Sequence, residues 1–160
     1  MTRQPTKHSG EKTSAAQQRI NRAMSAASLS RLLLMNFSDE AYQIVLAYEA
    51  DGYVPVGVYA VQDAQDWIRG ARRQLYAPLR YVRTMEQGQG DDKPFTVHRV
   101  IVSCQRADAE RIAAKWAHGP AWVEYIEPGQ LPALVEQFSG YVTAGSGRHS
   151  WGSSKGLIRS

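Results

Sequence analysis

The order in which two kinds of apolar spacing follow each other is the feature that most restricts how this chain can fold. Large apolar side chains recur at every second position in YQIVLAYE and FTVHRVIVSC, which is typical of strands. Elsewhere they recur at intervals of three and four, as in amphipathic helices. Together these patterns predict strands at 42–49, 79–86, 95–104 and 121–127, and helices at 61–76, 108–118 and 130–144.

This order is strand, helix, strand, strand, helix, strand, helix, and a further helix is predicted over residues 14–35. It is the order of a split βαβ unit of the ferredoxin-like kind. We therefore expect an α+β fold with a ferredoxin-like antiparallel sheet of four strands and additional N- and C-terminal helices. Its two middle strands are expected to carry Glu86 and His98. Because such sheets serve many functions, the function must be argued from individual sites.

The predicted domain organisation is one core with extensions, which suits a chain of 160 residues. In the N-terminal helix, helical spacing is followed by Ile20, Met24, Ala27 and Arg31. The stripe is thin, which suggests that the helix packs on another element. The expected parts are a disordered polar tail (1–13), the N-terminal helix (14–35), an α+β domain (36–144) and a basic Gly- and Ser-rich tail (145–160).

The chain carries no signal for export or for a membrane. Cys104 is the only cysteine, so no internal disulfide is possible, and a reducing compartment is the easier fit. The N-terminal residues lack an apolar signal core, and the longest apolar run is far shorter than the roughly 20 residues of a membrane span. We expect a cytoplasmic protein with no membrane partner.

Positive charge is concentrated at the two ends of the chain. Residues 1–35 contain six Lys or Arg and one acid, and residues 145–160 contain three Lys or Arg and no acid, although the whole chain has a net charge of only +4. Basic ends attract a polyanion through release of counterions, and nucleic acid is the commonest one inside cells. The alternative is that these are ordinary polar tails, which are often basic.

Three residues could together attack a DNA phosphate. Glu86 at the end of one predicted strand and His98 near the start of the next could meet across the turn, and Tyr141 on the last helix could approach them. A divalent cation there would polarise the phosphoryl oxygens while the phenol acts as nucleophile. Each residue also has an ordinary structural interpretation: a half-buried strand histidine, a core tyrosine and a solvated carboxylate.

Residues 36–157 resemble the HUH-type rolling-circle replication initiators, especially the short forms of plasmids and phages. The resemblance lies in the apolar first strand YQIVLAYE, in YVRTMEQG with its glutamate, in TVHRVIVS where the family has two histidines around an apolar residue, and in KWAHG. It continues in GYVTAG, where the family has Tyr-x-x-Lys, and in the ending WGSSKGL. It implies a tyrosine-dependent, metal-dependent nickase of single-stranded DNA.

The departures from the family pattern imply a disabled metal site. The residues two away from His98 are Thr96 and Val100, and Arg99 stands where a second imidazole is expected. Glu86 and His98 alone fall short of the coordination that magnesium or manganese needs. Ala144 replaces the lysine that follows the family's tyrosine. We therefore expect no cofactor, with Mn²⁺ or Mg²⁺ required only if the protein is a nickase after all.

The favoured interpretation is a non-catalytic relative of these initiators that binds DNA, single-stranded or hairpin, as a replication-accessory protein. One alternative is an inhibitor, encoded by a mobile element, of a host nuclease or defence complex; another is a metal-dependent tyrosine nickase. Trp151 should either dock on the core or stack on a partner, and the helix arginines could be only a solvated face. The predicted binding residues are Arg19, Arg22, Arg69, Arg72, Arg73, Arg148, Trp151 and Lys155.

Overall fold

The computed structural model describes residues 14–49, 52, 54–89, 94–144 and 151–159. The elements follow the predicted order, with one strand added at the end. They are α2 (Ala15–Asn36), β1 (Tyr42–Ala47), α3 (Val58–Arg72), β2 (Arg80–Gln89), β3 (Pro94–Ser103), α4 (Arg106–Ala113), β4 (Ala121–Tyr125), the 3₁₀ turn η1 (Pro128–Gln130), α5 (Leu131–Ala144) and β5 (Trp151–Ser153).

The strands form one antiparallel sheet in the order β4-β1-β3-β2-β5. The first four strands have the order of a split βαβ unit, in which β3 lies between β1 and β2. The predicted α+β, ferredoxin-like class is therefore confirmed, and residues 95–103 lie in a central strand as expected.

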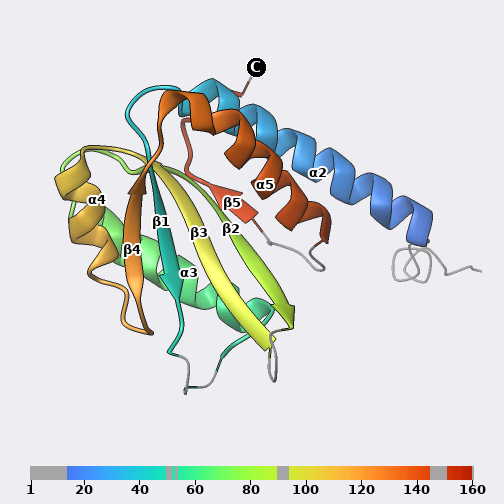
Figure 1. The fold of residues 1–160 in the computed structure, drawn as a ribbon, viewed down its shortest axis with the longest axis horizontal. Helices are drawn as coiled ribbons and strands as arrows, with labels where there is room; N and C mark the ends of the chain where they lie inside the picture. The colour runs from blue at the N-terminus through green and yellow to red at the C-terminus, as the bar shows by residue number, and fades with distance from the viewer. Residues whose placement is uncertain (1–13, 50–51, 53, 90–93, 145–150, 160) are drawn as a thin grey trace, which may run out of the picture.

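Helices cover both faces of the sheet, so the protein has three layers (Figure 1). One core lies between the sheet and the helices α3 and α4, and it includes Ile44, Val100, Trp67 and Ile112. The other lies between the opposite face and the helices α2 and α5, and it includes Val82, Ile101, Leu33 and Phe138. The alternation along β2 and β3 supplies both cores, because successive side chains point to opposite faces.

Only the second half of α2 packs on the body of the protein. Its N-cap is Ser14, whose hydroxyl accepts a hydrogen bond from the Gln17 amide. The predicted stripe is not the packed face, since Ile20 is 51% exposed and Met24 65% exposed. The packed face is shifted around the helix and toward its end, and consists of Ala26, Leu29, Leu32, Leu33 and Asn36.

The C-terminal segment belongs to the fold, which corrects the prediction of a tail over residues 145–160. β5 pairs with β2, with Thr84 opposite Trp151 and Val82 opposite Ser153, so the sheet has five strands instead of four. The side chain of Leu157 is buried in the core beneath α2 and α5. Residues 145–150 lie outside the described part of the chain. No helix of the described residues is long and apolar enough to span a membrane.

Candidate functional site

The sheet face toward α5 carries a row of hydrogen-bonded polar side chains, one from each of four neighbouring strands. Arg99 on β3 donates to Glu86 Oε1 on β2, from Nη2 at 3.0 Å and Nε at 3.2 Å. Its Nη1 also donates to Gln43 Oε1 on β1 at 3.4 Å, and Gln43 Nε2 donates to Glu124 Oε1 on β4 at 3.0 Å. The Arg99 guanidinium therefore forms an ion pair with the Glu86 carboxylate, which was predicted to bind a metal.

Tyr141 on α5 lies near the end of this row that contains Arg99 and Glu86. The Arg99 guanidinium carbon is 5.7 Å from the centre of the Tyr141 ring, within the range of a cation–π contact. Burial raises the pKa of the Tyr141 hydroxyl; nearby Arg99 partly opposes that rise. The structure thus brings Tyr141 and Glu86 to one face, as predicted, but a higher pKa leaves less phenolate to act as a nucleophile.

His98 lies on the other face of the sheet, which corrects the prediction that it would meet Glu86. His98 is opposite Met85 in the ladder, and Glu86 is opposite Val97, so one residue of register separates them. Tyr141 is likewise on the far side from His98. Among the described residues, no group of three or more His, Cys, Asp or Glu side chains is arranged to hold a metal ion.

His98 is instead the buried end of a series of hydrogen-bonded side chains, which was not predicted from the sequence. Its side chain is 1% exposed, and its Nε2 is 2.9 Å from the hydroxyl of Tyr48, just beyond the end of β1. That hydroxyl donates to Asp63 Oδ2 on α3 at 2.8 Å. Burial, reinforced by the positive charge of Arg83, lowers the pKa of His98 to about 3. His98 is therefore neutral at physiological pH.

The loop after α4 completes this cluster. α4 ends at Ala113, earlier than the predicted residue 118, and the chain then runs beside the end of β1, where the Glu49 amide donates to the His118 carbonyl. A Cβ on Gly119 would stand 2.6 Å from the Ala47 carbonyl oxygen, so only glycine permits this approach. His118 Nε2 comes to 3.7 Å from Asp63 Oδ1.

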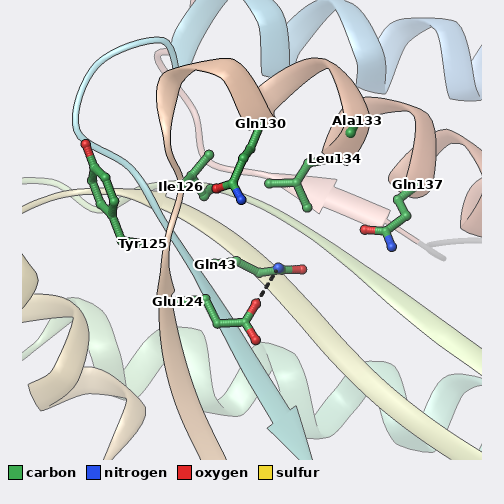
Figure 2. A pocket seen from close by; sticks show the side chains of 8 residues that line it. All are labelled: Gln43, Glu124, Tyr125, Ile126, Gln130, Ala133, Leu134 and Gln137. Atoms are coloured by element: carbon green, nitrogen blue, oxygen red, sulfur yellow. Dashed lines mark hydrogen bonds between the residues drawn. The ribbon is translucent and has the colours of Figure 1, made fainter.

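A cavity of about 420 Å³ opens on the α5 side, next to the polar row (Figure 2). Figure 2 shows the Gln43–Glu124 hydrogen bond on its sheet side and the side chains of Gln130, Leu134 and Gln137 on the side of η1 and α5. Its described lining contains a carboxylate and three amides but no Lys or Arg. Such a lining is unsuited to phosphate, which favours cationic partners and backbone N–H groups.

The predicted basic residues fall into two groups. Arg19 and Arg22 lie on the part of α2 that extends beyond the core, and Lys155 is exposed just after β5. The others lie at the end of α3: Arg69 forms an ion pair with Asp66, the Arg72 guanidinium stacks over the Tyr81 ring, and Arg73 is exposed. Arg148 lies outside the described residues.

Trp151 docks on the core of the protein, which is the first of the two roles predicted for it. Its side chain is half-buried against the core formed with α2 and α5, and its indole Nε1 donates to Ser25 Oγ at 2.7 Å.

Comparison of the whole chain with protein-family models, with curated proteins and with solved structures gives no match.

Proposed function

We propose that this protein is a non-catalytic DNA-binding protein of the rolling-circle-initiator type, and that it binds through a basic surface formed by α2 and the segment 151–159. We call this the α2–β5 surface. Its charged residues are Arg19, Arg22, Arg31, Lys155 and Arg159.

The observation that carries the proposal is that α2 and the segment 151–158, each from one of the two basic ends of the chain, lie side by side. Trp151 bonds to Ser25 near the middle of α2. Asn36, at the end of α2, donates to the Ile158 carbonyl oxygen at 2.8 Å and accepts from the Ile158 amide at 2.8 Å. Segment 151–158 therefore follows α2 from Ser25 to Asn36, so two segments that are far apart in sequence and both carry basic residues lie side by side (Figure 1).

The charge of this surface is of one sign. Neither α2 nor the segment 151–159 contains an Asp or Glu. Three of the four arginines of α3 and α4 differ in this respect, because Arg69, Arg106 and Arg111 each form an ion pair with an acid of their own helix. Within the described part of the chain, no ion pair involves a cation of the α2–β5 surface, so these cations can neutralise phosphates without breaking an existing ion pair.

The absence of nicking activity is proposed on three separate features. The Glu86 carboxylate is engaged by Arg99, His98 lies on the opposite face of the sheet, and burial raises the pKa of Tyr141. A nickase needs the carboxylate, the imidazole and the nucleophile to converge on one phosphate.

A second candidate function is protein binding, as an inhibitor of a nuclease or defence complex. It is favoured by the exposed stripe of Ile20 and Met24 on the extending half of α2. An amphipathic helix with an uncovered apolar side is a common means of binding a groove on another protein.

Titration of labelled oligonucleotides over a range of salt concentrations separates the two functions. DNA binding predicts measurable affinity for single-stranded or hairpin DNA at about 50 mM salt, with a log–log slope of about −0.7 per phosphate neutralised on single strands. Absence of binding at that salt concentration would refute the DNA proposal and favour protein binding.

A further inference from the structure

A second cavity, of about 470 Å³, opens at the outer end of the hydrogen-bonded series that begins at His98, on the side of the sheet away from α5. It lies between the end of β1 and the first turns of α3. Its described lining residues are Tyr48, Glu49, Gly52, Pro55, Tyr59, Gln62, Asp63 and His118. Its volume falls within the usual range for small-ligand sites, about 300 to 1,000 Å³.

In the series of hydrogen bonds from His98 through Tyr48 to Asp63, each hydrogen is donated in the direction of Asp63. A carboxylate oxygen can only accept, so the single hydroxyl hydrogen of Tyr48 goes to Asp63 Oδ2. His98 must then carry its hydrogen on Nε2 and donate to the Tyr48 oxygen. This assignment leaves His98 Nδ1 as a bare acceptor, and it is the one buried side-chain polar atom of the described residues without a partner.

Among the described residues, no hydrogen bond is made to the second carboxylate oxygen of Asp63, Oδ1. The His118 imidazole stands 3.7 Å from Oδ1, which is longer than a hydrogen bond. Glu49 adds a second carboxylate to the lining, and no Lys or Arg is among the described lining residues. Gln62 uses its amide nitrogen to donate to Asp66 at 3.0 Å, which leaves its carbonyl oxygen as an acceptor. The cavity therefore offers acceptors and negative charge.

The aromatic side chains of the lining favour a flat cation over a compact one. Tyr48 and Tyr59 both line the cavity, and the Tyr59 ring is largely exposed. A guanidinium can stack on such a ring while its N–H groups reach a carboxylate in the same plane, whereas an ammonium is a point charge. From these contacts we infer that the cavity binds a guanidinium group, with Asp63 as its main anionic partner and Tyr59 as its stacking surface.

The test uses N-acetyl-arginine amide and its uncharged isostere N-acetyl-citrulline amide, followed by NMR shifts of the His118 and Tyr59 rings in the full chain. The arginine compound is expected to bind with a dissociation constant on the order of 1 mM, and the citrulline compound at least about tenfold more weakly. Equal binding of the two compounds, or no binding of either, would overturn the inference.

The variant Asp63→Asn removes the charge but keeps an oxygen that can accept from Tyr48. It should weaken arginine binding at least about tenfold, while Asp108→Asn on α4, where Asp108 pairs with Arg111, should leave it unchanged. Full binding by Asp63→Asn would refute the role of Asp63.

A capped Gly-Arg-Gly peptide shows whether the guanidinium belongs to a protein or to a small molecule. Binding of the peptide as tight as that of the amino acid indicates an arginine side chain of a protein, and failure of the peptide to enter the cavity indicates a small molecule.

Discussion

The side chains of Glu86 and His98 project from opposite faces of one sheet, although their strands are neighbours. Glu86 is opposite Val97 and His98 is opposite Met85, so the two side chains differ by one position in the ladder. Glu86 pairs with Arg99 on one face, and His98 bonds to Tyr48 on the other. The sheet itself therefore separates the two groups that a metal ion would have to bind together.

The first prediction concerns nicking. Incubation with single-stranded origin-type DNA and Mn²⁺ should leave the DNA intact, because the carboxylate, the imidazole and Tyr141 do not converge. Denaturing gels and mass spectrometry would detect a nicked strand or a tyrosyl–DNA adduct. An adduct that is lost in Tyr141→Phe would contradict the proposal that the protein is non-catalytic.

A second prediction follows from the buried imidazole of His98. Its pKa is about 3 in the folded protein against 6.5 for a free histidine, so between these values the unfolded chain binds more protons. The free energy of unfolding should therefore fall as the pH drops from about 6.5, by up to about 1.4 kcal/mol per pH unit. Urea denaturation between about pH 5 and 6.5 measures this slope above the range where most carboxylates titrate.

The control for this pH dependence is a pair of histidine variants. His98→Gln keeps a donor for Tyr48 but cannot titrate, so the slope should become nearly flat. His118→Gln alters the partly exposed histidine of the same cluster and should keep most of the slope. A steep slope that survives in His98→Gln would show that other groups cause it.

The third prediction concerns the ion pair of Arg99 and Glu86. Both side chains are less than one-third exposed, so the pair is screened less than a surface pair. A double-mutant cycle with Arg99→Gln and Glu86→Gln should give a coupling free energy of about 1 kcal/mol. A coupling near zero would mean that Arg99 does not hold the Glu86 carboxylate in solution.

A fourth prediction tests the attachment of the C-terminal segment. Asn36 is buried, and its amide bonds to both the carbonyl and the amide of Ile158 and to the Leu32 carbonyl. Asn36→Ala would leave the carbonyl and the amide of Ile158 without this partner, at a cost of about 2 kcal/mol. Hydrogen exchange of residues 151–158 should then accelerate more than that of β3. Unchanged protection of these residues would contradict the arrangement of the α2–β5 surface.

The sequence predicted the layers of this protein well, because each layer has a strong period. Ile44, Leu46, Val100 and Val102 share one face at intervals of two, and Ala64, Trp67, Ile68 and Ala71 share one side of α3. β5 was not predicted, because the three residues Trp-Gly-Ser in a Gly- and Ser-rich stretch have no period to detect. Their pairing depends on contacts with β2 and α2 that are distant in sequence.

The sites were predicted less well, because they depend on register and on loops. Whether Glu86 and His98 share a face is decided by a single residue in the pairing of β2 with β3, which periodicity does not specify. The cluster around Asp63 combines a strand end, a helix and the loop carrying His118. The available signal was that Tyr48 continues the alternation of Leu46, and His98 that of Val100, in two strands that prove to be neighbours.

The measurement that tests the central claim most directly compares two variants with equal loss of charge. Arg19, Arg22 and Lys155 on the α2–β5 surface are changed to Gln in one, and the ion-paired Arg69, Arg106 and Arg111 in the other. DNA affinity of both is measured against salt concentration. The first should bind more weakly, with a log–log slope flatter by up to about 2 on single strands, while the second should bind like the parent. Equal weakening of both, or none in the first, would contradict binding through this surface.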